Sequence, residues 1–366
     1  MSGSGASIGR TSLRAWFAAA AAVTTTAAGT GFASTSMTER AARESMTPTG
    51  GAVIAVGHRG TRRFAPENTL SAHEMAIALG ARAIEMDVRM TADGEFVLMH
   101  DPAVNRTTDG RGLVSKMTLA EIRRLDAGSW FAPEFAGERV PTLREALRNI
   151  KGRAAVDIDF KAGPADSAER IARILDEERF DDGSLVTVFV RSWNYRKMKR
   201  LPKPYLLRPH YRNAAMTAQA AREDRVEVMG LRRRSFSFSA ARAIADAKLS
   251  LFSNVMGRDD NERGFADSLR AGARFIQTDR LDLLVPYLRE RGLLLECAPT
   301  RSFSCPPGAR DAVKLAAAAR REPPRPAALP AAALCASGAG AEPDSYRACK
   351  YSMGSTRAKP GVSSTR

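Results

Sequence analysis

Residues 53–101 read VIAVGHRGTRRFAPENTLSAHEMAIALGARAIEMDVRMTADGEFVLMHD. This stretch contains an apolar run at 53–57, a helical segment at 69–79 and a second apolar run at 83–88. Near-continuous apolar strands that alternate with helices are typical of a parallel sheet covered on both faces. The stretch therefore predicts an α/β fold.

The same alternation continues to residue 297. Further strand-like runs lie at 96–99, 154–160, 185–190, 205–208, 226–231, 249–255 and 273–278. Further helical runs lie at 143–149, 168–178, 239–247 and 281–291. A segment of this length and pattern is the usual size of a (β/α)₈ barrel. We predict that residues 51–297 form one TIM barrel, with a small insertion after the third strand run.

Nine strand runs compete for the eight positions of such a barrel. Residues 91–95, which separate the second run from the third, are too few for the crossover that joins parallel neighbours. The third run is therefore either a barrel strand or the return strand of a hairpin, and the sequence leaves this open.

The chain is basic, with a formal net charge of +16 over 366 residues. Residues 1–50 contribute +2 and residues 298–366 contribute +7 of this excess. A basic chain can bind nucleic acid, an anionic membrane or a phosphorylated substrate. We find no paired Cys/His finger and no aromatic RNA-binding segment, so no nucleic-acid partner is predicted. The simplest alternative is a basic solvated surface with a basic tail.

The two ends of the chain differ from the middle in composition. Residues 1–33 combine Arg10 and Arg14 with an alanine-rich run and small residues, the order of an export signal, so we expect a periplasmic or secreted protein. A disordered alanine-rich leader is the alternative, and the run is too short to span a bilayer. Residues 34–50 are interpreted as a linker.

Residues 298–366 are rich in Ala, Pro and basic residues, and this composition predicts a disordered tail. Such a tail could make weak contact with anionic surfaces. All four cysteines lie at residue 297 or beyond, and their spacing matches no tight metal clip.

Polar side chains gather where the first four strand runs end. In a barrel these ends form the face that carries the active site. The side chains are His58 and Arg59 after the first run, Glu85 and Asp87 in the second, His100 and Asp101 after the third, and Asp157, Asp159 and Lys161 in the fourth.

The spacing of these residues predicts a metal site. Glu85 and Asp87 are two residues apart on a strand, so both point to the same face, and the same period joins Asp157, Asp159 and Lys161. Two carboxylates with a third from a nearby strand make an oxygen-rich site for Ca²⁺ or Mg²⁺. A buried lysine there needs an anionic partner, either these carboxylates or a substrate phosphate.

Two of the four histidines of the chain, His58 and His100, end strand runs. A pair of imidazoles beside a divalent ion suits general acid–base catalysis on a phosphate ester, with Arg59 and Lys161 offsetting phosphoryl charge. A single histidine after a strand is more often structural. We interpret His73, inside a helical run, as structural, and leave His210 open.

Taken together, these segments resemble the glycerophosphodiester phosphodiesterase family. The resemblance spans roughly residues 53–293 and is most specific within 57–108. The motifs that carry it are Gly57-His58-Arg59-Gly60, Pro66-Glu67-Asn68-Thr69, Glu85-Met86-Asp87-Val88, Thr91-Ala92-Asp93-Gly94, Met99-His100-Asp101, Asn105-Arg106-Thr107-Thr108 and the 272–279 segment.

The resemblance implies a (β/α)₈ barrel that hydrolyses glycerophosphodiesters to sn-glycerol 3-phosphate and an alcohol with one Ca²⁺ or Mg²⁺ ion. It implies acid–base roles for His58 and His100 and places Arg59 and Lys161 at the phosphate. It makes Glu85 and Asp87 metal ligands. Asp159 stands where the family usually has a metal-binding Glu.

A second departure from the family lies on the leaving-group side of the pocket. Family members often place a Trp in the strand before the last, and residues 251–255 contain none. Trp193, after the fifth run, could line the pocket instead, or it could be an ordinary buried aromatic residue.

Two other functions remain open at this point. A lyase of the phospholipase D-like spider-toxin type uses a related barrel and would form a cyclic phosphate from a lysophospholipid. A barrel that had lost its chemistry would bind metal without turnover. Otherwise the expected partner is a small phosphodiester, and the expected protein is a phosphoric diester hydrolase.

Overall fold

A computed structural model describes residues 51–164, 166–180, 184–190, 205–224 and 226–299. The predicted signal (1–33), linker (34–50) and all but the first two residues of the predicted tail (298–366) lie outside these residues. They stay predictions, as does export.

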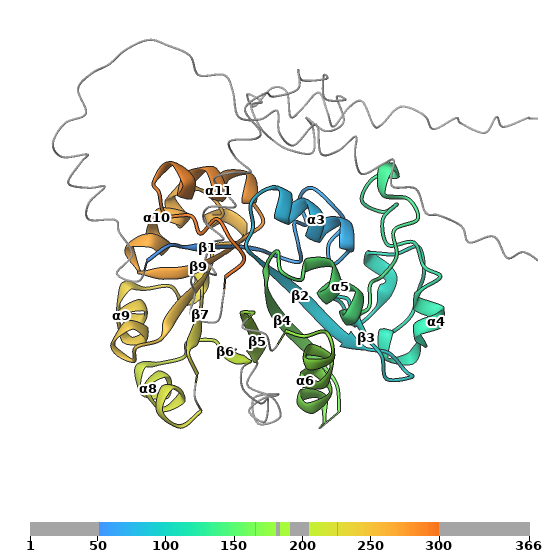
Figure 1. Cartoon of the computed structure of the whole chain (residues 1–366), viewed down its shortest axis with the longest axis horizontal. Coiled ribbons are helices and arrows are strands. Elements are labelled where there is room, and N and C mark those ends of the chain that lie inside the picture. The colour runs from blue at the N-terminus through green and yellow to red at the C-terminus, as the bar shows by residue number, and fades with distance from the viewer. Residues whose placement is uncertain (1–50, 165, 181–183, 191–204, 225, 300–366) are drawn as a thin grey trace, which may run out of the picture. The chain divides into compact units, whose positions relative to one another are not determined.

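Eight parallel strands form a nearly closed barrel, so the predicted fold class is confirmed (Figure 1). In spatial order they run β6-β5-β4-β2-β1-β9-β8-β7, and an isolated parallel bridge between His210 and Gly230 joins the last to the first. The strands are β1 (Ile54–Gly57), β2 (Ala83–Met90), β4 (Ala155–Ala162), β5 (Val186–Val190), β6 (Leu206–Pro209), β7 (Val228–Arg232), β8 (Ser250–Asn254) and β9 (Ala273–Thr278).

The third strand run is a hairpin return and not a barrel strand. β3 (Phe96–Leu98) pairs antiparallel with β2, with Met90 opposite Phe96. The turn between them uses Gly94 at φ 92°, a backbone conformation that costs glycine little. The structure thus decides the alternative that the sequence left open.

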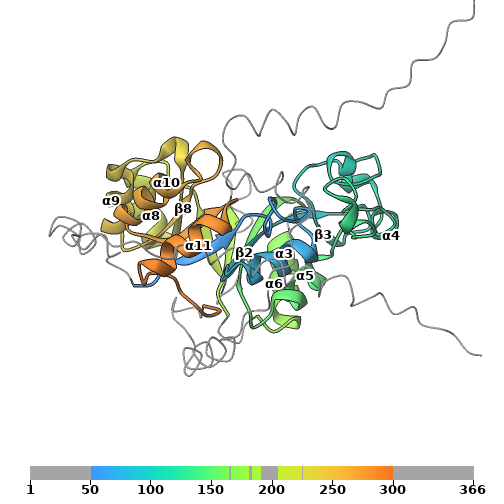
Figure 2. The same ribbon diagram turned by 90° about the horizontal axis from the view of Figure 1, so that it is seen from above.

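Seven helices of eight or more residues pack around the described strands. They are α3 (Leu70–Ala78), α5 (Leu143–Ile150), α6 (Ser167–Glu177), α8 (Ala214–Glu223), α9 (Phe238–Asp246), α10 (Glu262–Arg270) and α11 (Leu281–Glu290). In both views, α3, α5 and α6 lie on the side of β2 and β4, whereas α8, α9 and α10 lie toward β7 and β8 (Figures 1 and 2).

Helices α8 and α10 were not predicted from the sequence, because few of their residues are large and apolar. The only buried residues of α8 are Thr217 and Ala220. Gly264 and Ser268 supply half of the buried positions of α10. Each helix begins at an asparagine whose side chain accepts a backbone N–H of the first turn, which is a start signal that the sequence does contain.

Buried apolar residues alternate between two clusters along the strands. One cluster fills the inside of the barrel near the strand starts and includes Ile54, Val56, Ala83, Ala155, Leu185, Leu206, Val228, Phe252 and Phe275. The other, which includes Val53 and Ala55, packs between strands and helices. Because side chains alternate along a strand, inward-facing residues further along point into the barrel mouth.

The insertion after β3 has an apolar core of its own. This core comprises Val97, Met99, Val104, Val114, Ile122, Ala127 and Val140. The segment folds as the short helix α4 (Leu119–Ile122) and three 3₁₀ turns, Val104–Arg106, Val114–Lys116 and Pro133–Phe135. It lies beside β3, on the side away from α8 and α9 (Figures 1 and 2).

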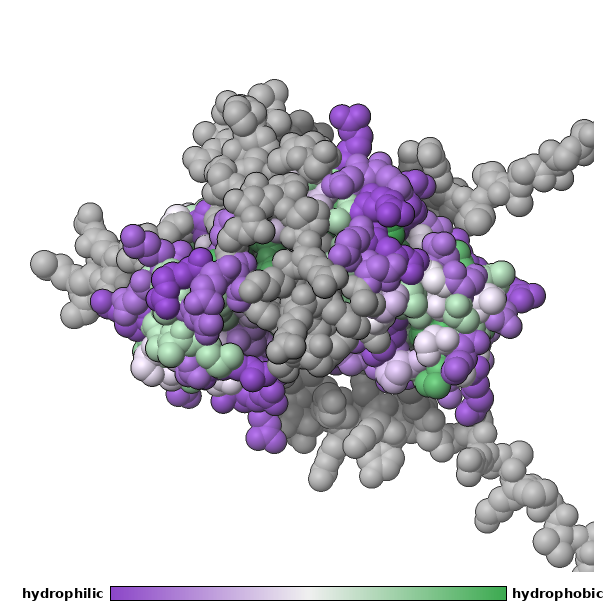
Figure 3. All heavy atoms as spheres, turned by 90° about the horizontal axis from the view of Figure 1, so that it is seen from below, coloured by the Kyte–Doolittle hydropathy of each residue, from purple (hydrophilic) through white to green (hydrophobic). Residues whose placement is uncertain are grey.

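In the coloured part of the face seen in Figure 3, hydrophilic residues predominate and hydrophobic groups form small patches. Four large apolar side chains of the described residues are exposed, namely Leu113, Trp130, Met216 and Phe238. Within the described ranges, no helix is both long enough and apolar enough to cross a bilayer.

Candidate active site

Three buried carboxylates meet at the carboxyl ends of β2 and β4. Glu85 and Asp87 lie on the inward face of β2, and Asp159 is the register partner of Asp87 on β4. One ligand oxygen of each residue lies within 4.8 Å of the others. All three residues are at most 7% exposed. The structure thus brings together the three carboxylates that the sequence singled out as metal ligands.

Burial and the neighbouring charges shift the pKa values of Glu85 and Asp87. Burial raises the pKa of Glu85 well above its ordinary value, and the charge of Asp87 adds to the effect. Burial acts in the same direction on Asp87, but Lys161 and Arg59 outweigh it and hold the pKa of Asp87 below its usual range. The cluster therefore needs nearby positive charge to stay ionised.

Lys161 and Arg59 supply part of that charge. Lys161 Nζ lies 2.7 Å from Asp87 Oδ1 and 2.5 Å from Asp159 Oδ2. Arg59 Nε lies 3.2 Å from Asp87 Oδ2, and the backbone N–H of Arg59 donates to Glu85 Oε2 at 2.8 Å. Both cations predicted to bind phosphate thus lie against the carboxylates.

Asp87 is also clamped by Asn68. The side-chain amide of Asn68 donates to Asp87 Oδ2 at 2.9 Å, and its oxygen accepts the Asp87 backbone N–H at 3.1 Å. Arg59 and Asn68 adopt left-handed backbone conformations, with φ of 53° and 58°. These turns fold the loop after β1 back on itself, so that the Asn68 N–H reaches the carbonyl of Arg59.

His58 follows β1 and is held by a carboxylate from the opposite end of the barrel sequence. His58 Nδ1 lies 2.7 Å from Asp279 Oδ1, directly after β9. Burial alone would raise the pKa of Asp279, but the hydrogen bond from His58 lowers it below its ordinary value. An ionised carboxylate accepts Nδ1–H, which leaves Nε2 as the nitrogen that can exchange a proton with a substrate.

Asp260 in turn holds the segment that carries Asp279. Its carboxylate accepts the Asp279 backbone N–H at 2.7 Å and the hydroxyl of Thr278. Burial raises the pKa of Asp260 to about 6.

His100 is held in a similar way from the insertion side. His100 Nδ1 lies 2.6 Å from Asp101 Oδ1, and Arg106 donates to Asp101 Oδ2 at 2.7 Å. Burial lowers the pKa of His100 below its ordinary value, although Asp87 and Asp101 act against it. The ring is therefore neutral near pH 7 and can accept a proton.

Glu67 links the loop after β1 to the insertion. Its buried carboxylate accepts from Arg59 Nη1 at 2.8 Å and from Arg106 at 2.7 and 3.0 Å. Arg59 belongs to the loop after β1, whereas Arg106 belongs to the insertion. A single carboxylate therefore links the insertion to the face of the barrel that carries the candidate site.

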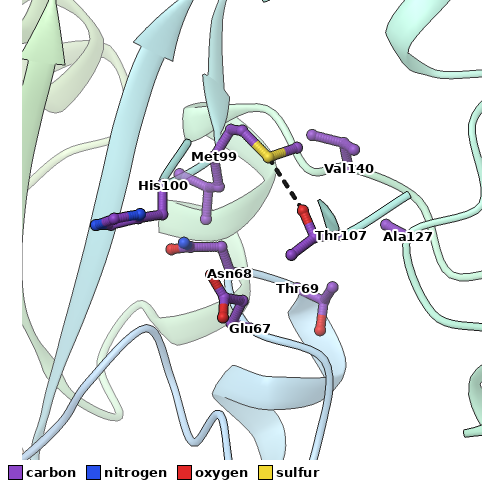
Figure 4. A pocket seen from close by; sticks show the side chains of 9 residues that line it. Glu67, Asn68, Thr69, Met99, His100, Thr107, Ala127 and Val140 are labelled. Carbon is purple, nitrogen blue, oxygen red and sulfur yellow. Dashed lines mark hydrogen bonds between the residues drawn. The ribbon is translucent and has the colours of Figure 1, made fainter. Parts of the chain in front are cut away.

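A small hollow lies where the insertion meets this face (Figure 4). Glu67, Asn68 and His100 group at one end of it, as Figure 4 shows. Met99, Thr107, Ala127 and Val140 lie at the other end, and the Thr107 hydroxyl donates to Met99 Sδ at 3.2 Å. The hollow thus continues from the candidate site into the insertion.

Two residues singled out from the sequence, Asp157 and His73, stand apart from the cluster. Asp157 is buried one step deeper and bonds Thr187 and Arg208. His73 is fully buried with no partner for either ring nitrogen among the described residues, in keeping with a structural role. Trp193 lies outside the described residues.

Sequence reasoning did not assign roles to the carboxylates that hold the histidines, Asp101 and Asp279. A carboxylate directly follows His100, and another directly follows the last strand run, so both signals were present. Nothing in the sequence indicated that Asp279 reaches His58 across the chain.

The donor set fits a hard divalent cation. Three carboxylates offer only oxygen ligands, which is the preference of Ca²⁺ and Mg²⁺. The raised pKa of Glu85 has burial and the neighbouring Asp87 as its main causes, and a bound cation would offset the second. Residues 85, 87 and 159 would hold such an ion.

Comparison with known proteins finds a matching family model and relatives that are named glycerophosphodiester phosphodiesterases. The model of the glycerophosphoryl diester phosphodiesterase family matches residues 58–201. YhdW of Bacillus subtilis, which is named for the same family, is 35% identical over 165 residues, covering 43% of this chain and 66% of that protein. A glycerophosphodiester phosphodiesterase of Caldanaerobacter subterraneus is 38% identical over 152 residues, covering 40% of this chain and 62% of that protein. The chain thus spans slightly less than two thirds of these relatives.

The solved structures extend the likeness to the whole barrel. The crystal structure of a glycerophosphodiester phosphodiesterase from Agrobacterium tumefaciens aligns with a TM-score of 0.56 and 29% identity. The alignment covers 64% of this chain and 99% of that protein.

Proposed function

The chain belongs to the glycerophosphodiester phosphodiesterase family, and from this premise we propose that it hydrolyses glycerophosphodiesters to sn-glycerol 3-phosphate and an alcohol. The observation that supports this most directly is the site itself. Three buried carboxylates and two cations gather at the end of β2 and β4, and each flanking histidine has its Nδ1 against a carboxylate.

The proposal gives the carboxylates the task of holding one Ca²⁺ or Mg²⁺ ion. When bound, such an ion polarises a phosphoryl oxygen and lowers the cost of the charge that develops there. Arg59 and Lys161 would add fixed positive charge around the same phosphate.

His58 and His100 would divide the proton transfers. Each is tethered through Nδ1, so each presents Nε2. One ring takes a proton from the attacking water and the other gives a proton to the leaving alkoxide, which releases the alcohol.

We would test this on the full chain by ³¹P NMR with glycerophosphocholine, in Ca²⁺, in Mg²⁺ and in EDTA. The expected result is a phosphomonoester signal that requires a divalent ion and is lost in His58→Ala. His73→Leu serves as the matched control, because His73 is buried away from the site and its replacement should leave the monoester signal in place.

A parallel incubation with lysophosphatidylcholine separates the lyase alternative. A cyclic phosphate in place of the monoester would assign the protein to the lyases. No product from either substrate, with metal still bound, would mean a barrel without turnover.

A further inference from the structure

A continuous chain of polar contacts joins His100 to the carboxylate cluster by way of the insertion. The closest atoms of neighbouring members lie 2.6 to 3.2 Å apart, and the members are, in order, His100, Asp101, Arg106, Glu67, Arg59 and Asp87. Acidic and basic groups alternate along this chain of contacts, so each inner member is held from both sides. The proposed chemistry gives no task to the two central members, Arg106 and Glu67.

Arg106 binds two carboxylates at once. Its Nε and Nη2 donate to the two oxygens of Asp101 at 2.7 and 3.2 Å. Its Nη1 and Nη2 donate to the two oxygens of Glu67 at 3.0 and 2.7 Å. A planar guanidinium can offer two such pairs of donors, whereas a lysine ammonium is a single point of charge. The geometry at position 106 therefore calls for arginine and not for positive charge alone.

Short-range hydrogen bonds hold the backbone from which Arg106 projects. The Val104 N–H donates to the Gly112 carbonyl at 3.0 Å, and the Asn105 side chain accepts the Gly112 N–H at 2.9 Å. The Thr108 hydroxyl donates to the Val104 carbonyl at 2.9 Å. The guanidinium is thus carried by an anchored turn, although the Arg106 side chain is 43% exposed.

The contact with Arg106 determines how Asp101 meets His100. The hydrogen bond from Arg106 holds the pKa of Asp101 well below its usual range, so this ionised carboxylate can only accept hydrogen bonds. Its Oδ1 lies 2.6 Å from His100 Nδ1, which makes Nδ1 the protonated nitrogen of the neutral ring. The Asp101 side chain is 29% exposed, so without Arg106 it would be free to turn toward solvent.

Glu67 acts on both arms of the chain of contacts. Its side chain is 5% exposed, and burial alone would raise its pKa, but Arg106 and Arg59 lower the pKa below its ordinary value. A buried, ionised carboxylate is costly to leave unpaired, so Glu67 holds both guanidinium groups against itself. Glu67 and His100 lie at the same end of the hollow, as Figure 4 shows.

We infer that Arg106 and Glu67 are positioning residues of the proposed reaction, Arg106 for His100 and Glu67 for both His100 and Arg59. The inference rests on the proposed function and adds to it two residues that act through other side chains. Arg106 sets the ring tautomer of His100 through Asp101. Glu67 fixes Arg106 and Arg59 together, so that the ring and the phosphate-binding cation are presented to the same substrate.

The first test reads the His100 ring directly and needs no turnover. Long-range ¹H–¹⁵N spectra of the full chain labelled with ¹⁵N-histidine report the tautomer of each of its four histidines, and His100→Ala assigns the His100 signals. Near neutral pH we expect the parent ring to carry its proton on Nδ1. Arg106→Gln should shift the His100 signals toward the tautomer protonated on Nε2. Arg111→Gln, which changes an exposed arginine of the same insertion, should leave them in place.

The second test separates the two residues by steady-state kinetics with glycerophosphocholine. Arg106→Gln should lower kcat roughly tenfold and change KM little, because it disturbs His100 and not the phosphate contact. Arg106→Lys should behave alike, because it keeps the charge and loses the paired donors. Glu67→Gln should lower kcat and also raise KM, because it releases Arg59. The double variant Glu67→Gln/Arg106→Gln should lose less kcat than the product of the single losses, since both act on one chain of contacts.

The outcomes distinguish this inference from the function on which it rests. His100 signals or a kcat that do not change in Arg106→Gln would overturn the role of Arg106 while the hydrolase stands, and so would full activity in Arg106→Lys. An unchanged KM in Glu67→Gln would overturn the link between Glu67 and Arg59. No turnover of glycerophosphocholine by the parent would overturn both the function and the inference. Melting curves of each variant show whether a loss reflects a lost fold.

Discussion

Single side chains decide how each histidine is presented. Asp279, which holds His58, has a side chain 20% exposed and is itself fixed by Asp260. Asp101, which holds His100, is 29% exposed and is fixed by Arg106. In both cases a carboxylate sets the tautomer, and a further group prevents that carboxylate from turning away.

Asp279→Asn should lower kcat while changing KM little. The amide can turn its NH₂ group toward His58 Nδ1, which would stabilise the wrong tautomer and move the proton to Nε2. We expect a loss of roughly 100-fold in kcat, within the usual range for general acid–base catalysis. Steady-state kinetics against pH would show it, and an unchanged kcat would rule out the positioning role.

Asp159 stands where, by the resemblance drawn from the sequence, a metal-binding Glu is expected. If it binds a divalent ion, Ca²⁺ or Mg²⁺ should raise the melting temperature, because a ligand that binds only the folded state stabilises it. Asp159→Asn should abolish this rise, whereas Asp166→Asn, an exposed residue just beyond β4, should keep it. A metal-dependent rise that survives in Asp159→Asn would contradict the assignment.

At the level of elements, helix starts connect the barrel to the insertion. α5 begins with a capping box, in which Thr142 Oγ1 accepts the Glu145 N–H and Glu145 Oε2 accepts the Thr142 N–H. The same glutamate accepts from Arg123 of the insertion at 3.0 Å. The first turn of α5 therefore also anchors the segment that carries Arg106.

Thr142→Ala should destabilise the protein by about 1 kcal/mol, because loss of the cap leaves a backbone N–H without its acceptor. Thr142→Ser keeps the hydroxyl and should cost much less. Urea unfolding of the three proteins gives the comparison. Equal midpoints for the alanine variant and the parent would show that the cap contributes nothing.

For the molecule as a whole, stability should depend on pH partly through His73. Complete burial lowers the pKa of His73 to about 4 from its ordinary value of 6.5. The unfolded state therefore binds a proton more readily than the folded state. Stability from this residue is fully present above pH 6.5 and is lost as the pH falls toward 4.

His73→Leu should remove this part of the pH dependence. A shift of this size corresponds to a loss on the order of 3 kcal/mol between pH 7 and pH 4. Unfolding free energies of parent and variant at both pH values give the difference, in which other titrating groups cancel. Parallel pH profiles would contradict the assignment.

Local pattern was enough to determine the fold class and most of the site. Strand ends are local features, and alternation along a strand sets the face of a side chain, so the spacing of Glu85, Asp87 and Asp159 was enough to group them. His58 and His100 stood out for the same reason.

Contacts between parts of the chain that are distant in sequence could not be predicted from local pattern and were decided by the tertiary structure. Whether residues 96–98 return along β2, and whether Asp279 reaches His58 over a separation of 221 residues, depends on barrel closure. Helices α8 and α10 were not predicted because small residues supply both buried positions of α8 and half of those of α10. The sequence by itself determined the local features that recur along the chain, namely the strand ends and the alternation of side chains along each strand. Contacts between distant parts of the chain arise only when β9 closes the barrel against β1.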